Sequence, residues 1–351
     1  MYGSSFVSDL QSVGGIAGEG RLRMRYWRLI VDGCLLGCLI TGLTVDRGLA
    51  QAGGKERKSP QLVWIDTDIG DDIDDAYALG LILHSPEVKV LGISTAFGDT
   101  EMRARIVDRY LKATGDLGIP VMAGVATQTD NKMTQLEYGE GFPARKHTDG
   151  VAGMLEAISA HPGQVTLIGL GPLFNVGAAI ERDPGTFRKV KRVVMMGGSI
   201  ERGYDGKKAE MRPADAEWNI LQDPKGAQKL LGVGVEIFMA PLDSTQIHLE
   251  ERRRVEIFAA GNPVTEQLKL LYPEWVANSW NHSPTPTLFD PVAAAYAFSP
   301  GLCPMEPMRI EIDDKGFTNR VAGTPNVQVC MKSDEAGFLE LLTKRLEARA
   351  K

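Results

Sequence analysis

The sequence predicts an α/β fold with an open, mostly parallel sheet and helices on both faces. Two observations lead to this prediction. Short apolar runs alternate with helical patterns along the chain, and the apolar runs are continuous, as in strands that are buried on both faces. We find no internal repeat and no convincing boundary after residue 60. A single domain with inserted loops is therefore expected over 61–351.

The expected elements alternate regularly. Strands are predicted, in chain order, at 61–66, 88–97, 119–124, 164–170, 190–198 and 235–243. Helices are predicted at 74–85, 101–115, 172–184, 249–260, 263–281 and 290–298, and a closing strand–helix unit at about 308–349. The helix at 101–115 ends at a glycine, and the helix at 172–184 has Pro172 in its first turn, where a missing N–H donor costs nothing.

Composition narrows the class of protein. The chain has 351 residues, 43% hydrophobic and 24% charged, with a formal net charge of −6, which is ordinary for a globular protein. A general nucleic-acid binder needs a basic surface, so no nucleic-acid partner is expected.

The N-terminus resembles a targeting segment. A basic stretch at 21–28 precedes an apolar run at 29–45, and Ala50-Gln51-Ala52 gives a small-x-small cleavage pattern. We therefore expect an N-terminal extension and signal peptide over 1–52 and a polar linker over 53–60. This predicts export, to the periplasm or as a secreted protein. An uncleaved segment would instead anchor the protein to the membrane, and no other stable membrane partner is expected.

Two cysteines, Cys303 and Cys330, remain after the predicted cleavage. An exported protein can oxidise such a pair, but spacing alone does not show that two sulfurs meet. A disulfide and two free buried thiols both stay open.

The stretch "WIDTDIGDDIDDAYAL" (64–79) places six aspartates in ten positions between an expected strand and helix. Helix capping uses one or two carboxylates, not six. Two carboxylates about 4 Å apart repel by about 4 kcal/mol at an effective dielectric constant near 20, so several converging here require protonation or a cation. An all-oxygen site favours Ca²⁺ or Mg²⁺. The EF-hand pattern fails, because Asp71 stands where its glycine belongs and Tyr77 where its glutamate belongs.

Five segments in order resemble the inosine–uridine-type nucleoside hydrolases. The first is Asp-x-Asp-x-Gly (66–70) followed by Asp-Asp-Ala (74–76), and the others are "GLGPLFN" (169–175), "VVMMGG" (193–198), "AEWN" (216–219) and "FDPVAAA" (289–295). The resemblance covers about residues 61–345. It implies an open, Rossmann-like α/β fold, a bound Ca²⁺, hydrolysis of the N-glycosidic bond of ribonucleosides, a role in nucleoside catabolism or purine salvage, and a homo-oligomer, either a dimer or a tetramer.

The resemblance also implies residue roles. Asp68 would be a metal ligand and the general base, with Asp75, Asp290 and the carbonyl oxygen of Leu170 as further metal ligands. Asp66 would be a supporting carboxylate. Substrate contacts would come from Asp74, Glu217 and Asn219, which would hold ribose hydroxyls, and from Asp99, Met196, His147 and Phe289.

The chain departs from the family pattern between Gly70 and Asp74. Three residues stand there, where the family commonly has one. Asp71 and Asp72 could be the paired aspartates instead. We prefer Asp74 and Asp75, because an apolar helix follows them at once. Asp71 and Asp72 would then lie in an expanded turn, with Asp72 as a candidate helix cap.

Further departures concern the leaving base. Phe289 stands where many members have a histidine that protonates the base, and Asp99 stands where many have asparagine. Both resemble purine-preferring members and favour purine nucleosides weakly. His147 is expected either to line the base pocket or to be an exposed loop histidine. The segment 272–290, with Tyr272, Trp275, Trp280 and His282, is expected to cover the leaving group.

Two alternatives stay open. One is a phosphatase that uses a nucleophilic aspartate of Asp66-Thr67-Asp68, although the later lysine and acidic pair of that class are not evident. The other is an exported nucleoside- or sugar-binding protein that keeps the metal site without turnover, which the Phe289 departure makes credible.

Overall fold

The computed structural model describes residues 59–205, 212–279 and 283–348. The predicted signal segment and most of the predicted linker lie outside these residues. Within the part of the chain that is described, no helix is long and apolar enough to cross a membrane.

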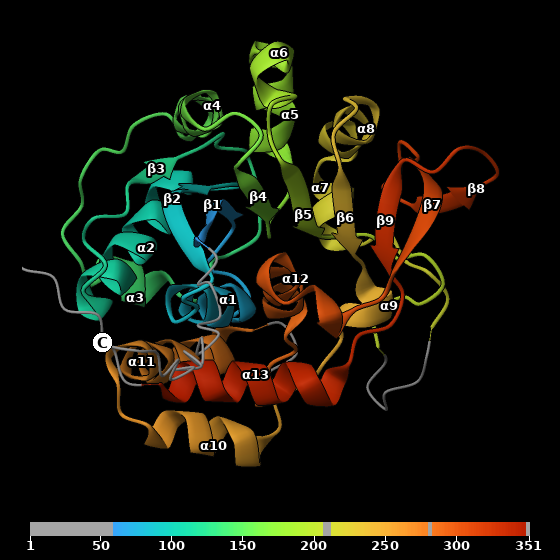
Figure 1. Ribbon diagram of the computed structural model, residues 1–351. Helices are drawn as coiled ribbons and strands as arrows, with labels where there is room; N and C mark the ends of the chain where they lie inside the picture. The colour runs from blue at the N-terminus through green and yellow to red at the C-terminus, as the bar shows by residue number, and fades with distance from the viewer. Residues whose placement is uncertain (1–58, 206–211, 280–282, 349–351) are drawn as a thin grey trace, which may run out of the picture. The chain divides into compact units, whose positions relative to one another are not determined.

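A nine-stranded mixed sheet runs through the domain (Figure 1). Its order is β3-β2-β1-β4-β5-β6-β9-β7-β8; β7 is antiparallel to β9 and β8 is antiparallel to β7, whereas the other neighbouring pairs are parallel. The strands are β1 (Gln61–Thr67), β2 (Val88–Thr95), β3 (Val121–Ala123), β4 (Thr166–Gly169), β5 (Arg192–Met196), β6 (Ile237–Ala240), β7 (Met305–Ile312), β8 (Thr318–Val321) and β9 (Val327–Cys330). The predicted mostly parallel α/β sheet is confirmed. The closing unit has three strands rather than the single strand expected.

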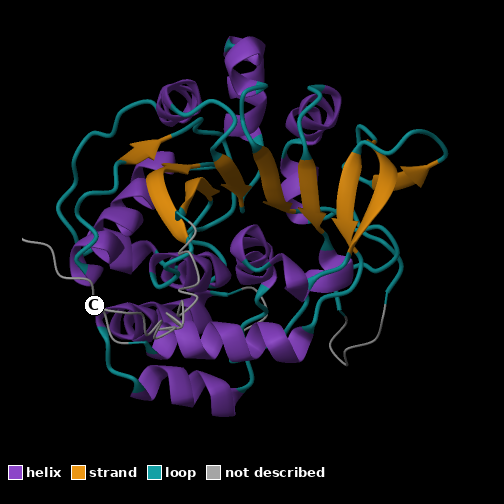
Figure 2. Ribbon diagram, in the orientation of Figure 1, coloured by secondary structure: helices purple, strands orange, loops and turns teal. Residues whose placement is uncertain are grey.

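Helices cover both faces of the sheet (Figure 2). One face carries α1 (Asp74–Leu83), α2 (Thr100–Thr114), α10 (Glu251–Ala259), α11 (Pro263–Asn278), α12 (Phe289–Phe298) and α13 (Glu335–Glu347). The other carries α4 (Gly150–Ala160), α5 (Phe174–Arg182), α6 (Pro184–Phe187) and α8 (Pro224–Gly232). Short elements complete the described chain: α3 (Leu136–Glu140), α7 (Trp218–Gln222), α9 (Leu242–Thr245) and the 3₁₀ turn η1 (Pro300–Leu302).

Strand β1 shows why its sequence is continuously apolar. Its side chains alternate between the two faces, and each face has its own hydrophobic core. Val63 and Ile65 belong to the core under α1 and α12, whereas Trp64 belongs to the core under α4 and α5. The Trp64 indole N–H donates to Ser94 Oγ of β2 at 2.9 Å, so this buried polar group is paired.

Two longer helices, α4 and α8, were not expected from the sequence, and neither were the short helices α3, α6, α7 and α9. Helix α4 begins after Asp149, whose side chain accepts hydrogen bonds from the amides of Val151 and Ala152. Helix α8 begins after Asp223, with Pro224 in its first turn. Both starts carry ordinary cap residues. The many glycines and small residues of these segments hid the helical pattern.

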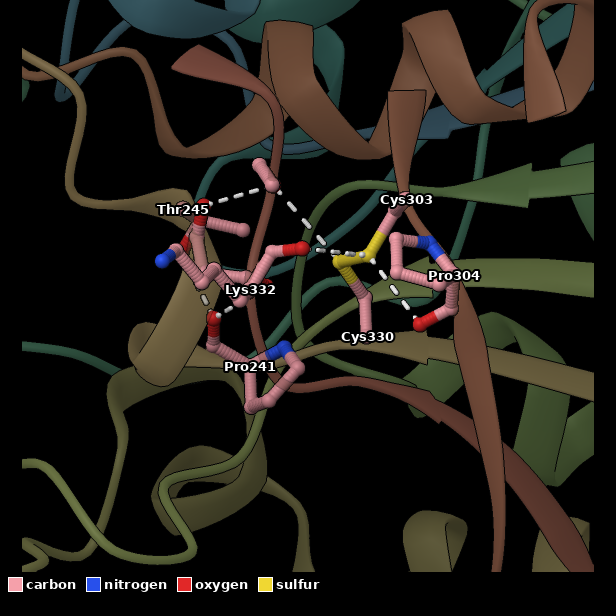
Figure 3. Close-up of a disulfide and its surroundings, with 8 residues drawn as sticks. Pro241, Thr245, Cys303, Pro304, Cys330 and Lys332 are labelled. Carbon is pink, nitrogen blue, oxygen red and sulfur yellow. Dashed lines mark hydrogen bonds between the residues drawn. A yellow bond between two sulfur atoms is a disulfide. The ribbon is translucent and has the colours of Figure 1, made fainter. Parts of the chain in front are cut away.

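Cys303, after η1, and Cys330, at the end of β9, form a disulfide with Cα atoms 5.8 Å apart (Figure 3). The alternative of two free thiols is therefore wrong. The bridge closes the β7–β8–β9 segment. Nearby, Ser333 Oγ donates to the carbonyl oxygen of Ser244 in α9 at 2.9 Å, which connects the same strand end to the loop after β6.

The strand order places a crevice at the end of β1. From β1 the chain adds β2 and β3 on one side and then returns to place β4 on the other side. Because the connections diverge there, the carboxyl ends of β1 and β4 form a topological switch point, where open α/β sheets bind their ligands.

Candidate active site

The acidic stretch lies at this switch point, between β1 and α1. Asp74 and Asp75 form the first turn of α1, and Ile73 is its N-cap residue, with no side-chain cap among the described residues. Asp72 Oδ1 accepts from the amide of the next residue, Ile73, at 2.7 Å, which is not a bond to the first turn of the helix. The interpretation of Asp72 as a helix cap is therefore wrong, because the lengthened turn places it one residue too early.

Three buried carboxylates meet here. Oxygen atoms of Asp74, Asp75 and Asp290 lie within 4.8 Å of one another. Asp290 comes from the first turn of α12, and its amide donates to Asp74 Oδ2 at 3.1 Å. Thr67, at the end of β1, donates its hydroxyl to Asp75 Oδ1. The paired aspartates that reach this cluster are thus Asp74 and Asp75, the pair preferred from the sequence.

Asp68 lies beside this cluster and against the turn after β4. A Cβ atom on Gly171 would lie 2.8 Å from Asp68 Oδ1, so the carboxylate approaches the backbone where only glycine fits. Burial and the negative charge of Asp75 raise the pKa of Asp68 well above its usual range, and the Arg103 guanidinium opposes this rise. Asp68 also raises the pKa of Asp290, which shows that the two carboxylates act on one another.

The electrostatics of the cluster fit a divalent cation. Burial, followed by mutual repulsion, raises the pKa of Asp74 and Asp290 well above the usual range, and burial raises that of Asp75 to about 6. At neutral pH these groups are stable as carboxylates only with a compensating charge. The donors are hard oxygen atoms, which Ca²⁺ and Mg²⁺ prefer. The carboxylates of Asp74, Asp75 and Asp290 are therefore suited to hold such an ion.

Asn219 joins the carboxyl ends of β4 and β5 next to the acidic cluster. Its side-chain amide donates to the carbonyl oxygens of Leu170 at 2.6 Å and Met196 at 3.3 Å. A carbonyl oxygen has two lone pairs, so Leu170 keeps one for a further partner. Glu217, the N-cap residue of α7, accepts from the amides of Asn219 and Gly198, each at 2.9 Å.

Sequence motifs and structure agree on one family. The family described as "Inosine-uridine preferring nucleoside hydrolase" matches residues 63–340, and this match covers the strand ends and both acidic segments described above. The chain belongs to this family. It is an enzyme family whose members hydrolyse ribonucleosides.

The relatives of this nucleoside hydrolase differ in the nucleosides for which they are named. The pyrimidine-specific ribonucleoside hydrolase RihA of Citrobacter koseri is 30% identical, over 81% of this chain and 97% of its own length. Among solved structures, the plant nucleoside hydrolase PpNRh1 has a TM-score of 0.71 and 26% identity, covering 82% of this chain and 99% of its own. A purine-preferring ribonucleoside hydrolase from Gardnerella vaginalis has a TM-score of 0.70 at 22% identity, covers 82% and 98%, and shows the shared fold.

The phosphatase alternative is excluded by this membership and by the position of Asp66. Its side chain is fully buried and accepts from Ser94 Oγ at 2.5 Å and Asn175 Nδ2 at 2.7 Å. Because these donors hold one carboxylate oxygen inside the core, Asp66 supports the strand end. It does not present a nucleophile to a substrate.

Two predicted substrate residues are engaged elsewhere. Asp99 is exposed, and its side chain accepts from the amide of Met102 as the N-cap of α2. His147 is buried, so the exposed-loop interpretation is wrong, and its ring nitrogens contact Glu101 at 2.6 Å and Asp108 at 3.0 Å. Burial opposes protonation, but these carboxylates hold the pKa of His147 above its usual value. Both ring nitrogens are thus already paired.

The nucleoside hydrolase site also contains Tyr204, which sequence reasoning missed. Its hydroxyl accepts from the amide of Trp218 at 3.0 Å and bonds to the Glu217 carboxylate. Its ring meets Phe289 edge to face, with centroids 6.1 Å apart. The only hint in the sequence is an aromatic residue within an unusually long loop before the Ala-Glu-Trp-Asn segment.

Only part of the segment 272–290, which was predicted to cover the leaving group, is among the described residues. Tyr272 and Trp275 lie in α11, where Trp275 is buried and bonds to the Asp72 side chain, and the Tyr272 hydroxyl donates to the carbonyl oxygen of Pro284 at 2.6 Å. Trp280 and His282 lie outside the described residues. Helix α11 thus packs against the acidic turn through the bond between Trp275 and Asp72.

Proposed function

We propose that this nucleoside hydrolase cleaves the N-glycosidic bond with Ca²⁺ bound by Asp75, Asp290 and the neighbouring Asp68, and with Asp68 as general base. The convergence of the buried Asp74, Asp75 and Asp290 carboxylates at the switch point, with Asp68 beside them, carries the proposal. Ca²⁺, when bound, would acidify the attacking water and clamp the ribose diol.

Asp68 supplies the base because it lies beside the cluster and burial raises its proton affinity. It accepts a proton from the attacking water, whose oxygen bonds to C1′ of ribose. The C1′–N bond breaks, its electron pair stays on the nucleobase, and the nucleobase takes up a proton from solvent water, to which Asp68 later returns the proton that it accepted. The buried carboxylates stabilise the positive charge that develops on the sugar. A single displacement by water inverts the configuration at C1′.

Ribose recognition falls to Asp74, Glu217 and Asn219. Asp74 shares its carboxylate with the Asp290 amide, and Asn219 joins the ends of β4 and β5. Asp74 belongs to the acidic cluster, and Asn219 contacts Leu170 beside the glycine that approaches Asp68, so we place the diol of a bound ribose between them. Met196 contributes its carbonyl oxygen to the same group.

For the base we propose a preference for purines. Phe289 cannot donate a proton, and with Tyr204 it forms an aromatic pair beside Asp290. A larger π-surface gains more from such a wall than a small one. Asp99 gives this preference no support, since it caps α2.

A ribose-release panel tests the function. The enzyme is incubated with Ca²⁺ and inosine, adenosine, uridine or cytidine, and free ribose is measured. Faster release of ribose from inosine and adenosine than from uridine and cytidine supports the proposal. Faster release from uridine or cytidine contradicts the purine preference. Tight nucleoside binding without ribose would instead favour the binding protein without turnover. Asp68→Asn should lower kcat by at least about 10³-fold. Asp314→Asn, on an exposed turn, is the matched control.

We also propose that the protein is exported and assembles as a homo-oligomer. The Cys303–Cys330 disulfide supports export, because such bonds persist in oxidising compartments. N-terminal sequencing of the processed protein tests cleavage after Ala52, and light scattering after gel filtration tests for a dimer or tetramer. An intact N-terminus or a monomer would contradict the respective proposal.

A further inference from the structure

Arg103 of α2 reaches under the acidic turn, although its side chain is only 2% exposed. Its Nε donates to the carbonyl oxygen of Phe97 at 2.7 Å. Its Nη1 donates to the carbonyl oxygens of Asp68 and, at 3.0 Å, Ile69. Its Nη2 donates to Asp71 Oδ2 at 2.8 Å. One planar guanidinium thus joins the loop after β1 to the loop after β2.

This arrangement satisfies a buried charge. A guanidinium removed from water is costly unless its donors are paired, and a carboxylate partner offsets its charge. Asp71 supplies that partner and also accepts from Asn131 Nδ2 at 3.0 Å. Its carbonyl oxygen accepts from the hydroxyl of Thr134. One oxygen of the Asp71 carboxylate, Oδ2, is therefore engaged by Arg103 and Asn131, although the negative charge of Asp71 still raises the pKa of Asp68 and Asp75.

The contacts explain how a lengthened turn can serve a metal site. The turn brings two extra aspartates and more backbone freedom between Asp68 and Asp74, and both would disturb a defined set of ligands. We propose that Arg103 is a positioning residue of the cation site: it fixes the backbone of Asp68 and pairs Asp71, so that this carboxylate does not enter the ligand shell. The inference rests on the Ca²⁺ site proposed above.

Charge and geometry predict opposite effects of removing Arg103. A nearby positive charge repels Ca²⁺, so charge alone would make the site bind more tightly without it. Loss of the hydrogen bonds frees the Asp68 backbone and releases Asp71, which would make the site bind more weakly. Geometry should dominate, because Asp71 at 2.8 Å already neutralises the guanidinium.

Calorimetric titration of the metal-free full chain with Ca²⁺ tests the inference. Arg103→Lys and Arg103→Gln should each weaken Ca²⁺ binding by about 10- to 100-fold, as for other residues that orient metal ligands. Lysine keeps the charge but not the planar fork, so it should not rescue binding. At saturating Ca²⁺, kcat should stay below wild type while KM changes little, since Asp68 remains displaced.

Two further variants complete the experiment. Arg105→Gln is the matched control, because Arg105 lies on the same helix and donates to the carbonyl oxygens of Phe142 and Glu140; it should bind Ca²⁺ as wild type does. Asp71→Asn should weaken binding even if the Arg103 variants do not fold, which thermal melting of the metal-free proteins checks. Unchanged or tighter Ca²⁺ binding in the folded Arg103 variants, or in Asp71→Asn, would overturn the inference. A wild type that binds no Ca²⁺ would instead refute the proposed metal site.

Discussion

The amide of Asp290 donates to Asp74 Oδ2 at 3.1 Å, and this bond joins two helix starts that are 216 residues apart in the chain. Helices α1 and α12 both begin at the carboxylate cluster. Their free N–H groups and dipoles favour negative charge there. The helix starts lower the cost of gathering these carboxylates but do not remove it, since burial still raises the pKa of Asp74 and Asp290.

Asp74 lies in the same carboxylate cluster as Asp75, but we propose that it binds ribose whereas Asp75 binds the metal. Asparagine variants can distinguish these two roles. Asp75→Asn and Asp290→Asn should each weaken Ca²⁺ binding by at least about 100-fold, since each removes a charged ligand. Asp74→Asn keeps an oxygen that can accept from the Asp290 amide, and should mainly raise KM through its ribose contact. Calorimetry and steady-state kinetics measure both effects. If Asp74→Asn loses Ca²⁺ as fully as Asp75→Asn, Asp74 is itself a metal ligand.

Gly171 should be needed for the position of Asp68. An alanine Cβ there would lie 2.8 Å from Asp68 Oδ1, so Gly171→Ala should displace the base and lower kcat by at least about 10-fold. Gly169→Ala is the control, because a Cβ at Gly169 meets no described atom closer than 3.8 Å. Equal kcat values for both variants would show that Asp68 tolerates the displacement.

The sequence was sufficient to predict the sheet and the acidic strand end. Continuous apolar runs such as that of β1 indicate a strand that is buried on both faces. Paired aspartates before an apolar run of helical length indicate the start of a helix. Asp290 was reached through a motif resemblance, because no local pattern connects it to a turn 216 residues away.

Residues that act through long-range contacts escaped sequence reasoning. Arg103 resembles any other basic residue on an amphipathic helix, and only tertiary packing shows that it is buried under Asp68. The burial of His147 escaped prediction for the same reason, since its partners Glu101 and Asp108 lie on another element. Side chains such as these are placed by packing rather than by local propensity.

Ca²⁺ should stabilise the enzyme more as pH rises. Burial raises the pKa of Asp75 to about 6 and that of Asp72 to about 7 in the metal-free fold, from 3.8. A raised folded-state pKa contributes stability that is present at low pH and is lost as pH rises through the folded value. Metal-free protein should therefore lose Tm between about pH 4 and pH 7, a window that these two values set. The gain in Tm on adding Ca²⁺ should grow over the same range, and a constant gain would contradict it.

The disulfide should stabilise the fold without serving catalysis. Cys303 and Cys330 are 27 residues apart, and closing a loop of that length is worth about 3.5 kcal/mol by the chain-entropy relation. Replacing both cysteines by serine should lower the free energy of unfolding by about that amount, as measured by denaturant titration. A reducing agent should destabilise the wild type similarly and leave the double variant unchanged. At a temperature where both proteins are folded, kcat should be equal, because the bridge joins the residue after η1 to the end of β9, outside the aspartate cluster. A variant that keeps full stability would show that the bond constrains the chain little, and a lower kcat would connect this edge of the sheet to the active site.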